Sequence, residues 1–195
     1  MRTVVLTQET KKDLLDSLLK RSPNNYDSYT DTVNEIVNTV RKGGDQALHD
    51  YTLKFDKVDI SAGQMIVTED EIKEAYSLVE PEVVEVIKKS AENIRVYHEK
   101  QKQYSWFDSK PDGTILGQKI TALSKVGVYV PGGKAAYPSS VLMNIVPAKV
   151  AGVESIIMVT PPGKDGKVNP GTLVAADIAG CDVIYKVGGA QAIAA

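Results

Sequence analysis

Apolar side chains in the first half of the chain recur three and four positions apart, which is typical of amphipathic helices. A first helix is predicted over residues 14–19, with Thr10 as its cap because an acidic residue follows three positions later. A second is predicted over residues 33–40 and ends at the paired glycines of residues 43–44. Residues 45–55 look like a further short helix. This part of the chain is therefore expected to be helical.

Breaks and longer elements follow this stretch. Residues 22–25 contain proline and asparagine and are expected to form a linker. A short strand is predicted at residues 65–67, and Thr68 with Glu71 forms a capping box for the next helix. Pro81 suits the first turn of the longest predicted helix, which extends to about residue 103.

Beyond residue 113 the apolar runs become short, as is typical of strands. Residues 115–123 are expected to form a strand or hairpin with Gly117 in its turn. Three further strands are predicted at residues 126–130, 155–160 and 182–187. One helix is expected between each strand and the next.

The helices between these strands have recognisable ends. Ser139 or Ser140 is expected to cap the first, and Pro147 is expected to kink it. Asn169 opens the second helix and Gly180 closes it. The alternation of strands and helices predicts parallel βαβ units with right-handed crossovers. The expected fold class is therefore α/β, with a helical amino-terminal region followed by a parallel sheet.

The change of pattern also suggests how the chain is divided. We expect an amino-terminal helical segment at residues 1–22, a helical region with short strands at 23–125, and an α/β domain at 126–195. The last predicted helix, residues 190–195, has no completed apolar face and no stop signal. A fragment of a longer protein is therefore expected.

Two glycine-rich loops are the candidate binding elements, because ligands gather at the carboxyl ends of parallel strands. They follow Val130 and Val187 and match neither the G-x-G-x-x-G fingerprint nor a P-loop. Glycine either lets a ligand approach the backbone or only permits a tight turn. If the strands are neighbours, Tyr129 and Gln191 can face one crevice. Tyr129 can equally be a core aromatic with its hydroxyl at the rim.

Composition narrows the class of protein. Lys and Arg total 23 against 25 Asp and Glu, a net charge of -2 that offers no electrostatic footprint for nucleic acid or an anionic membrane. No apolar run approaches the length of a membrane span. The single cysteine, Cys181, is compatible with a reducing cytoplasm, and its acidic neighbour Asp182 disfavours a nucleophilic thiolate. Two histidines and one cysteine supply a metal site poorly.

Four ordered motifs resemble histidinol dehydrogenase. They are VGVYVPGG at residues 126–133, YPSSVLMN at 137–144, PAKVAGV at 147–153 and VGGAQAIAA at 187–195. Residues 54–56 and 117–118 also match the family, whereas Ala122 stands where proline is more usual. The resemblance covers essentially the whole chain and is strongest after residue 126.

The resemblance implies an enzyme that oxidises L-histidinol to L-histidine through an aldehyde and reduces two NAD molecules in succession. It implies that residues 126–195 form an incomplete Rossmann-like NAD-binding domain. Tyr129 and Gln191 fall on positions that bind NAD. The zinc ligands and the acid/base pair of the family lie beyond Ala195, so no catalytic or metal-binding residue is assigned in this chain. The resemblance also implies a cytoplasmic homodimer when the protein is full length.

Two alternatives stay open. The chain could be a short non-catalytic nucleotide-binding or dimerisation module. It could also derive from a different zinc-linked alcohol or aldehyde dehydrogenase that shares the fold. Our hypothesis is that the chain is an amino-terminal fragment of histidinol dehydrogenase. It is expected to carry part of the NAD site and to have no catalysis of its own.

Overall fold

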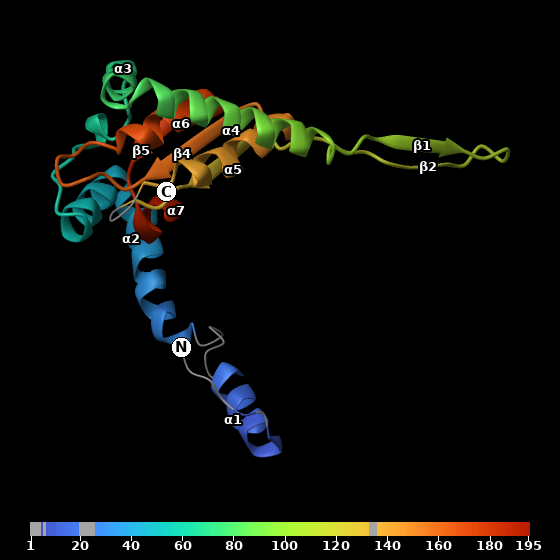
Figure 1. Cartoon of the computed structure of the whole chain (residues 1–195), viewed down its shortest axis with the longest axis horizontal. Coiled ribbons are helices and arrows are strands. Elements are labelled where there is room, and N and C mark those ends of the chain that lie inside the picture. Colours follow the sequence, from blue (N-terminus) through green and yellow to red (C-terminus); the bar gives the residue numbers. More distant parts are fainter. Residues whose placement is uncertain (1–4, 6, 20–25, 133–135) are drawn as a thin grey trace.

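The computed structural model describes residues 5, 7–19, 26–132 and 136–195 (Figure 1). In chain order its elements are α1 (Gln8–Leu19), α2 (Asp27–Phe55), the 3-10 turn η1 (Ala62–Gln64), α3 (Glu69–Leu78), α4 (Pro81–Glu99), β1 (Trp106–Ser109), β2 (Ile115–Gln118), β3 (Lys125–Tyr129), α5 (Pro138–Ala151), β4 (Ser155–Thr160), α6 (Pro170–Ala179), β5 (Val183–Lys186) and α7 (Gly189–Ala194). The linker predicted at residues 22–25 lies outside the described residues.

A parallel sheet forms the centre of the molecule, with the strand order β3-β4-β5. Val128 lies opposite Met158, and Met158 lies opposite Ile184. The intervening helices α5 and α6 connect neighbouring strands, so the predicted parallel βαβ units are confirmed, and with them the α/β fold class.

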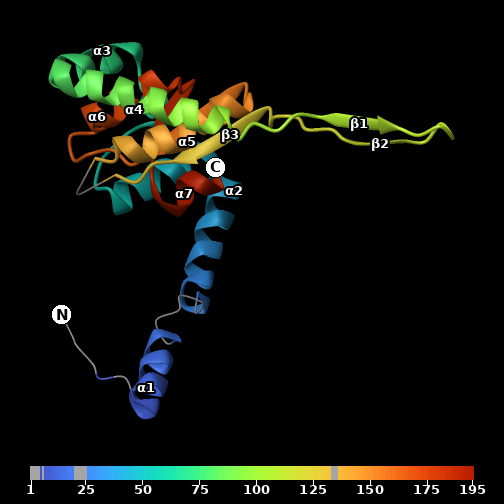
Figure 2. The ribbon, with the colours of Figure 1, turned by 45° about the vertical axis from the view of Figure 1, so that its right-hand side comes forward.

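The two faces of this sheet are covered by different helices (Figure 2). On one face Ile156, Met158 and Ile184 join a hydrophobic core with α5 and α6, and α3 and α4 pack over these helices. On the other face Val159 and Tyr185 contact a second core, made by buried residues of α2 and of the segment that follows it, against which α7 packs. Strand side chains alternate between faces, so each of these strands contributes to both layers.

The amino-terminal helices follow the predicted pattern with shifted ends. α2 contains both predicted helices, and they meet at Gly44, whose φ of 54° and ψ of -135° are not helical. α1 begins before Thr10, because the Thr7 hydroxyl accepts a hydrogen bond from the Thr10 amide at 3.1 Å. Thr7 is therefore the cap, and the prediction of Thr10 is wrong. α4 ends at Glu99, four residues earlier than expected.

Of the two helices that connect the parallel strands, α6 has the predicted ends and α5 does not have the predicted cap. The side chain of Asn169 accepts hydrogen bonds from the first amides of α6, and Gly180 ends that helix in the left-handed conformation. α5 begins at Pro138, so Ser139 and Ser140 lie inside its first turn and do not cap it. The helix continues past Pro147 to Ala151.

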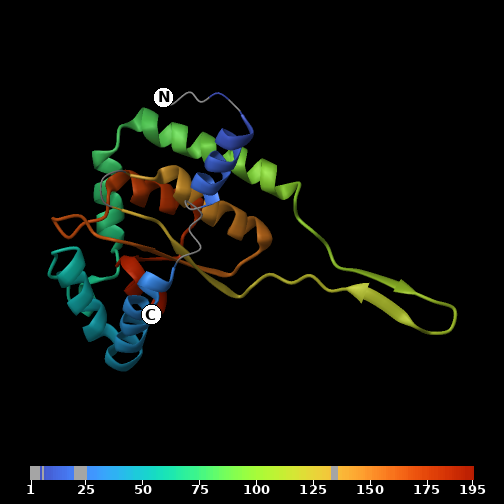
Figure 3. The same ribbon diagram turned by 90° about the horizontal axis from the view of Figure 1, so that it is seen from below.

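A two-stranded arm of β1 and β2 projects from the body (Figures 1 and 3). Every residue of both strands is exposed. Its turn contains Gly113, with φ of 85°, and not Gly117 as predicted. Gly117 lies within β2 opposite Phe107, whose ring occupies the place of a Cβ at Gly117. This glycine is therefore explained by the close approach of the Trp106 carbonyl and of Phe107 on the paired strand.

Candidate functional site

Two glycine-containing loops meet at the carboxyl end of the parallel sheet. The Tyr129 hydroxyl accepts a hydrogen bond from the Gly189 amide at 3.2 Å. Since β4 lies between β3 and β5, this contact reaches across the end of the middle strand. Tyr129 remains 38% exposed. Tyr129 is thus in direct contact with the first residue of α7, the helix that carries Gln191.

Pro161, which directly follows β4, packs between these two loops. A Cβ at Gly132 would lie 2.7 Å from the Pro161 ring, and one at Gly188 would lie 2.5 Å from it. Gly189 has a φ of 68°, which also favours glycine. Close packing and backbone conformation therefore account for these glycines without a ligand. Glycine at these positions is not by itself a sign of a binding site.

Gln191 is the most unusual residue of the site. It is 1% exposed, and neither its carboxamide oxygen nor its nitrogen has a hydrogen-bond partner among the described residues. The carboxamide lies over Gly189, where a Cβ would overlap it. A buried polar group without a partner costs about 1–3 kcal/mol. Such a group fits a site in which a ligand supplies the missing donor and acceptor.

Two polar residues to which the sequence analysis assigned no role in the site share this property. Thr52 Oγ1 and Asp56 Oδ2 are also buried without a partner in the part of the chain that the structure describes. Thr52 lies near the end of α2, which packs against α7, and Asp56 follows the helix directly. Burial raises the pKa of Asp56. The sequence could not predict this, because hydrophobic periodicity does not indicate whether a buried polar group forms a hydrogen bond.

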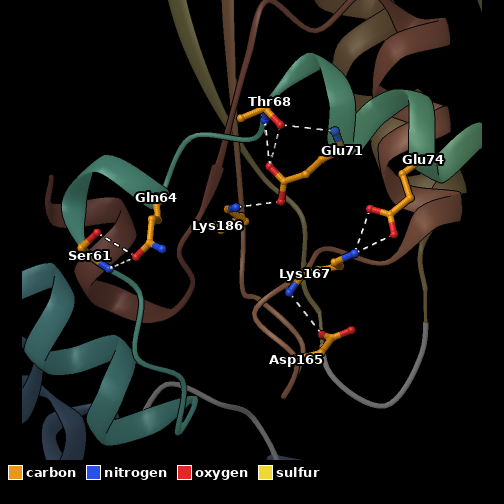
Figure 4. Close-up of polar contacts among 8 residues, drawn as sticks. All are labelled: Ser61, Gln64, Thr68, Glu71, Glu74, Asp165, Lys167 and Lys186. Atoms are coloured by element: carbon orange, nitrogen blue, oxygen red, sulfur yellow. Dashed lines mark hydrogen bonds and ion pairs between the residues drawn. The ribbon is translucent and has the colours of Figure 1, made fainter.

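An ion pair fixes α3 beside the end of β5 (Figure 4). Lys186 Nζ donates to Glu71 at 2.8 Å, and the same carboxylate accepts from the Thr68 amide at 2.9 Å. Lys186 has a side chain only 9% exposed. Burial acts to raise the pKa of Glu71, but the hydrogen bonds from Lys186 and Thr68 outweigh it and lower that pKa. The predicted capping box is confirmed, and its glutamate also has a tertiary partner.

A hollow of about 310 Å³ opens beside the first loop and Pro161. Its lining includes Thr160, Asn169 and Lys167. The Asn169 side chain already accepts from the first amides of α6, and Lys167 Nζ donates to Glu74 at 2.6 Å. Two of the polar groups that could bind an anion here, those of Asn169 and Lys167, are therefore already engaged.

Cys181 lies away from this site and is poorly suited to nucleophilic chemistry. Burial is the main cause that raises its pKa to about 11, so the thiol is protonated near neutral pH. Within the described ranges no group of three or more His, Cys, Asp or Glu side chains is placed to hold a metal ion. None of the described helices is both long and apolar enough to cross a membrane.

The histidinol dehydrogenase family model matches residues 19–195. Histidinol dehydrogenase of Bacillus subtilis is 58% identical over 164 residues, which is 84% of this chain and 38% of that protein. The Methanocaldococcus jannaschii protein of the same name is 49% identical over 189 residues, covering 96% of this chain and 44% of its own length.

Solved structures agree with these relatives. The crystal structure of histidinol dehydrogenase from Elizabethkingia anophelis matches with a TM-score of 0.80 and 35% identity, covering 85% of this chain and 38% of that one. The chain thus spans about two fifths of the length of these relatives. Because the family model matches nearly the whole chain, the chain belongs to the histidinol dehydrogenase family.

Proposed function

We propose that this chain supplies part of the NAD site of an enzyme that oxidises L-histidinol to L-histidine through the aldehyde. Tyr129 and Gln191 are the residues to which we assign NAD binding. The observation that carries the proposal is the hydrogen bond between Tyr129 and Gly189, which joins the two loops at the carboxyl end of the sheet. In parallel sheets this is the end at which ligands bind.

The two side chains offer complementary contacts. The half-exposed ring of Tyr129 presents an aromatic face for stacking, and its hydroxyl already orients the second loop. The orphaned carboxamide of Gln191 offers one acceptor and two donors. When bound, NAD accepts the hydride. The chain's own residues bind and orient the cofactor and do not take part in proton transfer.

We propose that the whole enzyme uses zinc, but the described residues of this chain do not form a site that could hold it. No cluster of metal-ligating side chains occurs in the ranges that the structure describes. We propose that the zinc ligands and the acid/base pair lie outside this chain. Catalysis then requires the remainder of the full-length protein, which we propose to be a cytoplasmic homodimer.

The test is an NAD titration of the 195-residue chain by calorimetry. Tyr129→Ala is expected to weaken binding roughly tenfold, because stacking and one hydrogen bond are lost together. Tyr104→Ala is the control, since Tyr104 lies at the root of the arm and is 74% exposed. Equal affinities for the two variants would contradict the assignment of Tyr129.

Gln191→Leu separates binding from folding. Removing an unpartnered buried carboxamide is expected to raise the free energy of unfolding by about 1 kcal/mol. If Gln191 binds NAD, the same variant loses affinity while it gains stability. A gain in stability with unchanged NAD affinity would assign Gln191 a purely structural position. The chain alone is expected to show no histidinol-dependent reduction of NAD.

A further inference from the structure

Both ring nitrogens of His49, a residue of α2, face carboxylates. Nε2 lies 2.8 Å from Asp59 Oδ1, and Nδ1 lies 3.2 Å from Asp50 Oδ1. The Gln46 side-chain amide donates to the same Asp50 oxygen at 2.9 Å, which holds that carboxylate beside the ring. A neutral imidazole has one N–H and can donate to only one of the two carboxylates. The arrangement therefore fits the protonated ring, which donates from both nitrogens.

The charges around this imidazole come from α2 and from the chain that follows it. Among the described residues, Asp45 one turn earlier on α2, and Asp56 and Lys57 beyond the helix, make no hydrogen bond or ion pair with the ring. η1 and α7 also pack against α2, and neither contains Asp, Glu, Lys, Arg or His. The hydrogen bond to Asp59, and next the one to Asp50, raise the pKa of the imidazole above 6.5.

Asp59 connects α2 to the segment of residues 57–60, which leads from the end of that helix to η1. Val58 and Ile60 belong to the second core, whereas Lys57 and Asp59 are exposed. Lys57 has a φ of 61°, so the chain leaves α2 through a left-handed turn. A lysine keeps this conformation where neighbouring contacts hold it. The contact of Asp59 with the imidazole, two residues beyond the turn, is one such contact.

The same segment lines a hollow of about 330 Å³. Residues 164–166 line it as well, and a Cβ at Gly166 would lie 3.5 Å from Val58 Cγ1. The hollow also reaches Lys186, which is ion-paired with Glu71 (Figure 4). A movement of the segment would therefore alter the surroundings of Lys186 at the end of β5.

We propose that His49 is a pH-sensitive switch, whose protonated ring holds residues 57–60 against α2. When the ring loses its proton, one nitrogen presents a lone pair to a carboxylate, and the contact on that side is lost. The turn at Lys57 then opens more often. Both carboxylates are largely exposed, so the expected change in opening is that of a surface ion pair, roughly two- to fivefold. The switch does not depend on the proposed binding of NAD.

The raised pKa of His49 sets the direction of the effect. A histidine whose pKa is higher in the folded chain stabilises that fold fully below the ordinary value of 6.5. This stabilisation is lost as the pH rises through the raised pKa. The segment is therefore expected to be held in mildly acidic solution and released in alkaline solution.

The first test is an NMR titration of the histidine rings in the 195-residue chain from pH 5 to pH 9. Asp59→Asn and Asp50→Asn each remove one carboxylate and are expected to lower the midpoint of His49. The larger decrease is expected in Asp59→Asn, because its contact is shorter. His98 is the reference in the same spectra, since its ring packs edge-on against Tyr97 and forms no ion pair among the described residues. Its titration curve is expected to be the same in all three chains.

The second test is limited digestion by trypsin, because cleavage after Lys57 requires the segment to open. Lys119, an exposed residue of the arm, is the reference that corrects for the pH dependence of trypsin itself. The ratio of initial cleavage at Lys57 to that at Lys119 is expected to be roughly two- to fivefold higher at pH 8.5 than at pH 6. In Asp59→Asn the ratio is expected to be high already at pH 6 and to change little with pH.

Two results would overturn the proposal. In one, neither asparagine variant lowers the midpoint of His49, which would mean that the carboxylates do not hold the protonated ring. In the other, the cleavage ratio of the native chain is the same at pH 6 and pH 8.5, or rises equally in Asp59→Asn. Opening of the segment would then be independent of His49.

Discussion

The strands of the central sheet and those of the arm have similar lengths but opposite surroundings. In β4 the side chains of Ile156 and Met158 are fully buried. In the arm Trp106 is 55% exposed and Phe107 is 66% exposed. Both pairs are apolar, and both lie in regular strands. The difference teaches that apolar side chains favour a strand, whereas burial depends on what packs against it.

The comparison also predicts how stability is distributed. The central sheet has helices on both faces, while among the described residues the strands of the arm pair with each other and join neither hydrophobic core. Isolated two-stranded hairpins are marginally stable in water. We therefore expect the arm to open locally at a small fraction of the free energy required to unfold the sheet.

Truncation of a core side chain gives the largest expected effect. Met158→Ala is expected to lower the free energy of unfolding by about 2–5 kcal/mol, because a cavity forms in a closely packed layer. Trp106→Ala in the arm removes a larger side chain and is expected to change it by less than about 0.5 kcal/mol. Chemical denaturation followed by far-UV circular dichroism measures both. Comparable losses in the two variants would show that the arm is part of the cooperative unit.

Glu71→Gln extends the comparison to helices that pack around the sheet. The change leaves the buried Lys186 ammonium without its counter-charge and is expected to cost about 2–3 kcal/mol. Glu74→Gln is the matched control on the same helix, because Glu74 and Lys167 are about half exposed and such pairs contribute about 1 kcal/mol or less. Equal costs would indicate that burial of Lys186 has no energetic consequence.

The pH dependence of Glu71 follows from its lowered pKa. The pKa of Glu71 in the folded chain lies below its ordinary value of 4.5. The stabilisation from its ion pair with Lys186 is therefore fully present above pH 4.5 and is lost as the pH falls through the folded pKa. The native chain is therefore expected to approach Glu71→Gln in stability under acid conditions. A constant difference between them from pH 7 to pH 3 would contradict the ion pair as its source.

Two crowded glycines test the comparison with the same substitution. Gly188→Ala would push a methyl group against Pro161 and is expected to cost about 1–3 kcal/mol. Gly117→Ala would collide with the Phe107 ring and the Trp106 carbonyl, yet it is expected to disturb only the arm. Thermal unfolding reports the first effect, and tryptophan fluorescence reports the second. A large global loss from Gly117→Ala would mean that the arm and the sheet unfold together.

The smallest expected effect is a gain. Lys57 has a φ of 61°, a left-handed conformation that a lysine adopts at some cost. Lys57→Gly relieves this strain but gives the unfolded chain more conformational entropy. The net result expected is a gain of about 0.5–1 kcal/mol in the free energy of unfolding. Gly63→Lys is a control at a position whose Cβ meets open space. Loss of stability in Lys57→Gly would show that the lysine side chain makes a compensating contact.

Much of the fold could be predicted from local signals. The capping box of Thr68 and Glu71, the Asn169 cap and the Gly180 terminus are confirmed because each depends on residues within four positions. The predicted cap at Thr10 and the predicted turn at Gly117 are wrong, because other residues decide both positions. A nearby threonine forms the cap of α1, and an aromatic ring from the paired strand occupies the space beside Gly117.

The candidate site was less accessible from the sequence. The motifs pointed to Tyr129 and Gln191 through the family resemblance, and the two glycine loops were located by the strand pattern. That Tyr129 contacts Gly189, and that Pro161 packs against Gly132 and Gly188, depends on residues tens of positions apart. Whether the two predicted residues bind NAD stays a prediction.

By itself the sequence determined the helices, the parallel strands and the family of this protein, since hydrophobic periodicity, caps and ordered motifs each depend on residues close together in the chain. Only the tertiary structure decided which face each helix covers and which polar groups of the described residues are buried without partners. These properties arise when distant segments exclude water from one another. Local propensity does not determine these contacts, and so the burial of the Gln191 carboxamide without a partner is seen only in the folded chain.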